Sequence, residues 1–147
     1  MRLNQVTLPA TDLAASIQFY ETLGLRLIVR ADHYARFELP EGEATLSLHV
    51  SENAARTDAP VIYFECEDLD AVHARLAAAG VAFDTAPTDQ RWLWREVQLR
   101  DPAGNALILY YAGENRKNPP WRLIPPIRNA ASPPVPGASG QRRARGP

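Results

Sequence analysis

The stretch Gln5-Val6-Thr7-Leu8-Pro9-Ala10-Thr11-Asp12-Leu13 decides the fold, because most of its pattern returns later in the chain. It is typical of a short strand followed by the start of a helix, and the helix runs on to Gly24. The run Val61-Ile62-Tyr63-Phe64-Glu65-Cys66-Glu67-Asp68-Leu69 repeats this order and leads to Gly80. The two aspartates lie 68 − 12 = 56 positions apart, and the two glycines keep the same offset. One strand–helix unit has therefore been used twice.

Each predicted helix is followed by three strand-like segments: 25–30, 34–39 and 44–50 in the first half, and 81–85, 92–100 and 106–111 in the second. Pro40-Glu41-Gly42-Glu43 and Asp101-Pro102-Ala103-Gly104-Asn105 supply turns before the last strand of each half. The sequence thus predicts an α+β fold of two tandem βαβββ modules, residues 1–55 and 56–112. At 147 residues, one domain built from both modules is the economical interpretation.

Composition limits the classes of partner. The formal net charge is −1, which gives no reason to expect a nucleic-acid partner for the folded part. Cys66 is the only cysteine, so an intramolecular disulfide and a cysteine-based metal knuckle are excluded and a cytoplasmic protein is favoured. The N-terminus runs straight into a strand, and no apolar run is long enough to cross a bilayer, so we expect no membrane association.

The character of the chain changes after residue 112. Residues 113–127 are too polar and too rich in proline for a helix or strand, but Trp121 and Leu123 predict an extended segment that packs on the domain. Residues 128–147 are rich in Pro, Ala and Gly and carry arginines at 142, 143 and 145, which predicts a disordered basic tail. Three arginines without interleaved aromatic residues are a weak footprint for nucleic-acid binding.

Alternation along the strands separates two faces of the predicted sheet. In segment 44–50, Leu46 and Leu48 turn towards the helix, whereas Ser47 and His49 turn away. The same reasoning assigns further residues to the helix-free face: Tyr34, Arg36, Glu38, Tyr63, Trp92, Trp94 and Glu96. A face that combines aromatic rings with a few charges suits a small-molecule site. A subunit interface or plain solvent exposure is the alternative.

The chain resembles the vicinal oxygen chelate superfamily, the group of glyoxalase I, bleomycin-resistance proteins, fosfomycin-resistance transferases and extradiol dioxygenases. The motifs that carry the resemblance are Val6-Thr7-Leu8, Asp12-Leu13, Ser16, Phe19-Tyr20, Leu23-Gly24-Leu25 and the turn 101–105, and the match covers roughly residues 1–111. The resemblance implies a mixed sheet that curls around a cleft, with the helices on its outer face. It also implies a homodimer.

Metal enzymes of this superfamily hold a divalent ion on the first and last strands of each module. The matching positions here are Gln5, Ser47, Val61 and Ile108. Val61 and Ile108 have no ligand atom, so the resemblance favours a protein without the usual metal. The alternative is one divalent ion, Ni, Zn, Mn or Fe, at a displaced site made by Gln5, His49 and Glu96.

Several residues allow more than one role. His49 is a candidate general base or a histidine at the mouth of the cleft. Glu96 is a candidate catalytic carboxylate or a charge partner of Arg36, and Arg36 itself is suited to gripping a carboxylate or phosphate or is an exposed strand arginine. Trp92 and Trp94, two positions apart, form either a stacking surface for a ligand or part of a subunit interface.

Two functions remain open at this stage. The first is a metal-independent binder of a small organic molecule, similar to the bleomycin-resistance branch. The second is a metal-dependent lyase, isomerase, dioxygenase or transferase in which His49 and Glu96 act in catalysis. In either case the predicted ligand contacts are Gln5, Arg36, Ser47, Tyr63, Trp92, Trp94 and Tyr110.

Overall fold

The computed structural model describes residues 3–56 and 58–123. The first module consists of β1 (Gln5–Ala10), α1 (Leu13–Leu23), β2 (Arg26–Ala31), β3 (Tyr34–Glu38) and β4 (Thr45–Val50). The second consists of β5 (Ile62–Glu65), α2 (Leu69–Ala78), β6 (Thr88–Asp89), β7 (Arg95–Arg100) and β8 (Ala106–Tyr111), and the short 3-10 helix η1 (Gly113–Arg116) follows. The predicted basic tail, 128–147, and residues 124–127 before it lie outside the described residues.

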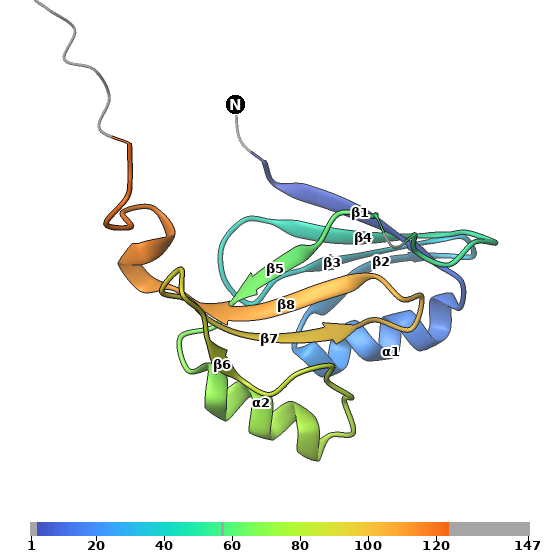
Figure 1. Cartoon of the computed structure of the whole chain (residues 1–147). Coiled ribbons are helices and arrows are strands. Elements are labelled where there is room, and N and C mark those ends of the chain that lie inside the picture. The colour runs from blue at the N-terminus through green and yellow to red at the C-terminus, as the bar shows by residue number, and fades with distance from the viewer. Residues whose placement is uncertain (1–2, 57, 124–147) are drawn as a thin grey trace, which may run out of the picture.

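Each module forms one mixed four-stranded sheet, with the order β1-β4-β3-β2 in the first (sheet A) and β5-β8-β7-β6 in the second (sheet B). The first and last strands of each module pair in parallel, and the other neighbours are antiparallel. The sheets are curled but not closed (Figure 1). The predicted fold class, two tandem βαβββ modules, is confirmed.

The two helices begin and end in the same way, as the repeat predicts. The carboxylate Oδ1 of Asp12 accepts from the Ala15 amide at 2.9 Å, and that of Asp68 accepts from the Ala71 amide at 3.1 Å. Each aspartate thereby satisfies one of the free amides of the first helical turn. Gly24 and Gly80 have φ angles of 104° and 90°, the left-handed conformation that ends a helix and that residues with a Cβ rarely adopt.

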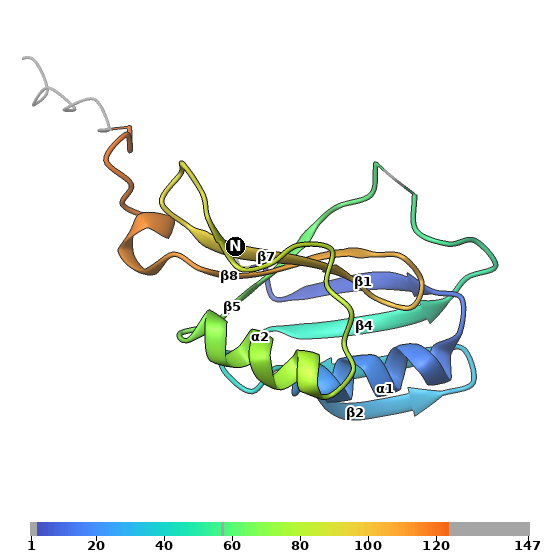
Figure 2. The ribbon, with the colours of Figure 1, turned by 60° about the horizontal axis from the view of Figure 1, so that its bottom comes forward.

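A single hydrophobic core joins the two modules. It contains Leu46 and Leu48 of sheet A, Leu99 and Leu107 of sheet B, and Tyr20 of α1, all of them nearly or fully buried. Figures 1 and 2 show both helices on the same side of the molecule, where they cover the apolar face of the sheets. We call the opposite face of each sheet, which no helix covers, its open face.

Two predicted strands differ from the observed ones. The segment predicted as 92–100 begins its strand only at Arg95, because Leu93 has a φ of 68° and the Trp94 carbonyl accepts from the Gln90 amide, which makes a tight turn. The segment predicted as 81–85 contributes a single bridge between Phe83 and Leu99. A left-handed residue ends the regular alternation of side chains, so periodicity alone misplaces Trp92.

The segment after β8 is anchored at its start. Arg116 forms a 3.2 Å salt bridge with Glu65 at the end of β5. Trp121 and Leu123 are 57% and 89% exposed, and the packing of the whole segment 113–127 stays a prediction because its last four residues lie outside the described chain. No helix among the described residues is long and apolar enough to cross a membrane.

Candidate functional site

Three aromatic rings gather on the open face of sheet B. Trp94 stacks on Tyr110 with ring centroids 4.7 Å apart and an angle of 23° between the ring planes. Tyr63 meets both rings edge-on, at 5.7 Å from Tyr110 and 6.0 Å from Trp94. We call these three residues the aromatic cluster. Tyr63 is 48% exposed, so one side of the cluster remains open to a ligand.

The local chain geometry explains why these rings meet. Tyr63 on β5 pairs with Ile108 on the adjacent parallel strand β8, and Tyr110 lies two residues beyond Ile108. Residues two positions apart on a strand point to the same face, so both tyrosine rings lie on the face away from the helix. Burial, followed by the nearby Glu65 carboxylate, raises the pKa of Tyr110 above its ordinary value. The Tyr110 hydroxyl therefore stays protonated at neutral pH and can donate a hydrogen bond.

Glu96 and Trp92 lie beside this cluster but have a different arrangement from the predicted one. Glu96 pairs with Tyr110 across β7 and β8 and is only 4% exposed. Its carboxylate Oε1 accepts from the indole nitrogen of Trp92 at 2.8 Å. Trp92 thus acts as a hydrogen-bond donor from the turn before β7, and a shared stacking surface of Trp92 and Trp94 for a ligand stays a prediction. Among the residues that the structure describes, no ion pair joins Glu96 to Arg36.

A polar cluster occupies the open face of sheet A. The Tyr34 hydroxyl lies 2.7 Å from the Ser47 hydroxyl and accepts from the Arg36 Nε at 2.8 Å. The Arg36 guanidinium carbon also lies 5.4 Å from the centre of the Tyr34 ring. Burial acts to raise the pKa of Tyr34, but the hydrogen bonds from Ser47 and Arg36 and the positive charge of Arg36 outweigh it and lower that pKa.

The residues of the displaced metal site are not brought together. Gln5 pairs with Thr45, whereas His49 pairs with Pro9 four residues further along the same two strands. At about 3.3 Å per residue, the backbone atoms of Gln5 and His49 lie about 13 Å apart along the strand direction. Glu96 belongs to the other sheet. One ion, with ligand bonds of about 2 Å, does not reach all three side chains.

The family positions for a metal fit no better. Val61 and Ile108 present only hydrocarbon, and the Ser47 hydroxyl is fully buried against Tyr34. Gln5 is exposed and its amide oxygen accepts from the Thr45 hydroxyl at 3.2 Å. Within residues 3–56 and 58–123, no three His, Cys, Asp or Glu side chains lie close enough to hold an ion. No chemical step is therefore assigned to a metal.

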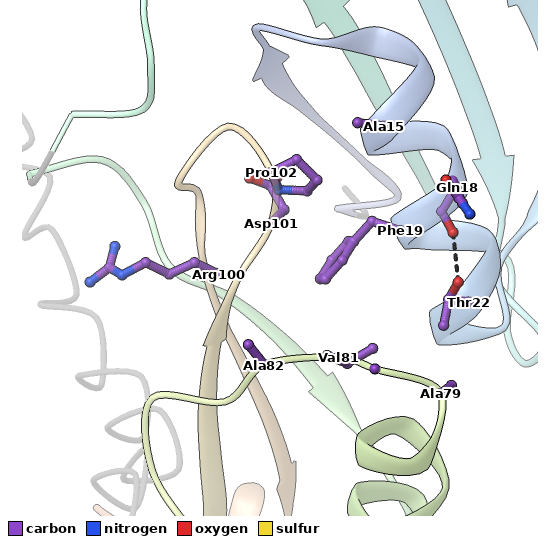
Figure 3. Close-up of a pocket in the computed structure, with 11 residues that line it drawn as sticks. Ala15, Gln18, Phe19, Thr22, Ala79, Val81, Ala82, Arg100, Asp101 and Pro102 are labelled. Carbon is purple, nitrogen blue, oxygen red and sulfur yellow. Dashed lines mark hydrogen bonds between the residues drawn. The ribbon is translucent and has the colours of Figure 1, made fainter.

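Two cavities lie away from both open faces. One, of about 350 Å³, opens between α1 and the loop after α2, and Figure 3 shows Phe19 and Pro102 at its wall. Its two charged residues are engaged elsewhere: Arg100 points away and forms a salt bridge with Asp84, and Asp101 accepts hydrogen bonds from Tyr20 and from the turn around it. The second, of about 440 Å³, lies among the loops that connect the modules. None of the predicted site residues lines either cavity.

Tyr34 is the site residue that sequence reasoning did not select. Its place on the polar face of β3 followed from alternation, but its contacts with Arg36 and Ser47 depend on the register between β3 and β4. In that register Arg36 pairs with Ser47, and Tyr34 is two positions from Arg36 on the same face. The turn composition at 40–43 predicted a hairpin without fixing this register.

Comparisons with known proteins agree with this geometry. An uncharacterised protein of Mycolicibacterium smegmatis is 33% identical over 109 residues, which are 74% of this chain and 91% of the relative. A glyoxalase/bleomycin resistance protein/dioxygenase from Nocardioides shares the fold with a TM-score of 0.66 and 25% identity, over 84% of this chain and 90% of that one. A bleomycin-binding protein complexed with bleomycin has a TM-score of 0.62 and 21% identity, over 76% of this chain and 98% of that one.

A family model matches most of the chain. Residues 2–109 match the family described as the Glyoxalase/Bleomycin resistance protein/Dioxygenase superfamily. This range contains both modules and every strand of the two sheets except the last two residues of β8. The chain belongs to the glyoxalase/bleomycin resistance protein/dioxygenase superfamily.

Proposed function

We propose that the protein binds a small organic molecule against the open face of sheet B, without a metal ion. The observation that carries this proposal is the aromatic cluster of Tyr63, Trp94 and Tyr110. Rings that pack edge-on and stacked hold one another in place, so little conformational entropy is lost when a ligand covers them. A flat, largely apolar molecule is the type of ligand that such a surface favours.

Polar groups beside the cluster add orientation. The Tyr110 hydroxyl is a donor at neutral pH, and the carboxylate of Glu96, fixed by Trp92, is an acceptor on the same face. A few polar groups at the edge of an apolar surface are what small-molecule sites use to select among ligands of similar shape. The likeness to a bleomycin-binding protein supports the proposal, because that protein holds an organic molecule on the same fold.

The alternative function, a metal-dependent lyase, isomerase, dioxygenase or transferase, is less well supported. It needs about three ligands around one ion, and two of the four family positions, Val61 and Ile108, carry no ligand atom. His49 is exposed, and its Nδ1 lies 2.9 Å from the carbonyl of Val50, which leaves Nε2 for any other role. We therefore place ligand binding ahead of catalysis.

We further propose that the protein works as a cytoplasmic homodimer. Val61 at the edge of sheet B is 42% exposed, and Trp121 in the segment after β8 is 57% exposed. Large apolar side chains left exposed on a chain are candidates for an interaction surface. Sedimentation equilibrium of the full chain, compared with the variant Trp121→Ala, tests this assembly; a monomer at all concentrations would contradict it.

The ligand is best sought with a panel of metabolites and antibiotics, screened by thermal shift with and without divalent metals. For each hit, Trp94→Ala is expected to weaken binding about tenfold or more, because it removes the stacked ring at the centre of the cluster. Tyr111→Ala, which removes an exposed aromatic ring that does not belong to the cluster, is the control and is expected to leave the affinity unchanged. Unchanged affinity in Trp94→Ala together with loss of the dimer would assign the cluster to the subunit interface instead.

A further inference from the structure

Arg36 is partly buried and has no carboxylate partner among the described residues. The other partly buried arginine of the described chain, Arg95, pairs with both Asp70 and Asp89. Arginines that make no salt bridge with a described residue are otherwise exposed: Arg30, Arg75, Arg91 and Arg122. Arg36 is thus the one described arginine that combines partial burial with an uncompensated charge.

The surroundings of Arg36 supply no counter-charge. Its neighbours across the strands are Val29 on β2 and Ser47 on β4, both uncharged. The nearest acid on its own strand and face is Glu38, whose carboxylate is bonded to Arg26. A partly desolvated cation without a counter-ion is unfavourable, so this position gains free energy when an anion binds beside it.

Tyr34 holds the guanidinium in one orientation. Its hydroxyl oxygen accepts a hydrogen bond from the Arg36 Nε at 2.8 Å, and the Arg36 guanidinium carbon lies 5.4 Å from the centre of its ring. The Nε edge is therefore occupied, and the two terminal amino groups remain as a planar fork. Such a fork matches the two oxygens of a carboxylate or phosphate, and its fixed position lowers the entropy lost on binding.

We propose that Arg36 and Tyr34 form an oxyanion subsite that binds the carboxylate or phosphoryl group of the ligand. The Tyr34 oxygen accepts from Arg36, and Ser47 is placed to donate to the same oxygen, which frees the phenolic proton for the anion. The ligand class is then an organic acid or a phosphoryl compound. That this molecule is the ligand of the aromatic cluster rests on the proposed function, whereas recognition of the anion is measurable by itself.

The test uses three probes that share one benzene ring: benzoate, phenylphosphonate and the neutral benzamide, which has the shape of benzoate without its charge. Affinities are measured on the full chain by NMR titration at constant ionic strength, and the readout is the ratio of acid affinity to amide affinity. Wild type is expected to favour at least one acid about tenfold or more over the amide. Whichever acid binds more tightly distinguishes a planar carboxylate ligand from a tetrahedral phosphoryl ligand.

Matched variants separate the subsite from general electrostatics. Arg36→Gln is expected to bring the ratio close to one, and Arg30→Gln, which removes the same charge from an exposed position on β2, is expected to keep it. Arg36→Lys keeps the charge without the fork and should give an intermediate ratio, which serves if the glutamine variant fails to fold. Tyr34→Phe should lower the ratio while leaving the amide affinity unchanged, because Tyr34 positions the fork.

The possible results are distinguishable from those that test the aromatic cluster. Equal loss in Arg30→Gln and Arg36→Gln, equal binding of acid and amide to wild type, or no saturable binding of either acid in the millimolar range would each overturn the subsite. If Trp94→Ala weakens all three probes equally while the ratio still depends on Arg36, both proposals stand. If the ratio depends on Arg36 but Trp94→Ala changes nothing, the subsite stands and binds its anion apart from the cluster, whose function is then decided by the ligand panel.

Discussion

The hydroxyl of Tyr20 on α1 donates a 2.8 Å hydrogen bond to Oδ2 of Asp101, which lies in the turn between β7 and β8 of the other module. The Asp101 carboxylate also accepts from the Ala103 amide and from the amide and side chain of Asn105. Asn105 in turn donates to the carbonyl of Pro9 on β1 at 2.9 Å. One buried turn of the second module is therefore bonded to both the first strand and the helix of the first.

This contact predicts the effect of removing one hydroxyl. Tyr20→Phe keeps the ring in the core but leaves Asp101 one bond short, and it is expected to lower the free energy of unfolding by about 1–2 kcal/mol. Urea denaturation measures the change. Tyr63→Phe is the matched control, because Tyr63 is half exposed, and should stay within about 0.5 kcal/mol of wild type. Equal stability of Tyr20→Phe and wild type would show that the contact adds nothing.

The same tyrosine predicts how stability changes in alkali. Burial and the neighbouring Asp101 carboxylate raise the pKa of Tyr20 far above its ordinary value near 10. Above about pH 10 the unfolded chain therefore loses a proton that the folded chain retains, so stability falls as pH rises, by up to about 1.4 kcal/mol per pH unit. Below pH 10 this contribution is constant. Denaturation curves at pH 9, 10 and 11 should show a shallower fall for Tyr20→Phe; parallel falls would contradict the assignment.

Trp92 is expected to act through its hydrogen bond to Glu96. Trp92→Phe keeps an aromatic ring but removes the donor from a carboxylate that is 4% exposed, which should cost about 1–3 kcal/mol of stability. Glu96→Gln in the Trp92→Phe background should recover part of the loss, because a neutral amide is less costly to bury without this donor. A double-mutant cycle measured by thermal unfolding gives the coupling; a coupling near zero would show that the two side chains act independently.

The helix-ending glycines are predicted to respond equally in the two modules. A Cβ at Gly24 or Gly80 meets no atom within 4 Å, so Gly→Ala acts only through the backbone, which has a positive φ at both positions. Each alanine variant is expected to lose about 1 kcal/mol, and Gly→Asn about half as much, because asparagine tolerates this conformation better. Chemical denaturation of the four variants checks this; alanine variants as stable as wild type would argue against left-handed helix ends.

Metal removal is expected to have no effect. Dialysis against a chelator should leave both the melting temperature and the affinity for any ligand unchanged, because the residues at the family's metal positions supply too few ligand atoms. Elemental analysis after mild purification, followed by titration with Ni, Zn, Mn and Fe, provides the measurement. Stoichiometric binding that is lost in His49→Ala or Gln5→Ala would instead support the metal-dependent alternative.

The sequence predicted those features that depend on local chemistry. The helix ends at Gly24 and Gly80 follow from residue type and from the 56-residue repeat. Residue type allows either Thr11 or Asp12 to cap the first helix, and the structure selects Asp12 and its repeat counterpart Asp68. Alternation likewise separated buried Leu46 from the residues of the open face. Each of these signals lies within a few residues of the structure it predicts.

The features that sequence reasoning missed depend on contacts between distant residues or on unusual backbone angles. Tyr20 and Asp101 lie 81 positions apart, and nothing local to either residue points to the other. The left-handed conformation of Leu93, which moves Trp92 off the strand, is rare for a leucine and has no signal in the pattern. The separation of Gln5 from His49 required the register of β1 and β4, which alternation does not provide.

The turn 101–105 also bears on how the duplicated halves behave as a unit. Its counterpart in the first half, 40–43, is an exposed hairpin turn. The turn 101–105, in contrast, is hydrogen-bonded through Asp101 and Asn105 to Tyr20 and Pro9 of the first half. Unfolding of either half therefore breaks the hydrogen bonds that join it to the other half and lowers the stability of both. Although the chain consists of two copies of one unit, it should consequently unfold in a single cooperative transition. Two copies of the first half should not replace the natural pair of halves, because the first half lacks the turn that makes these bonds.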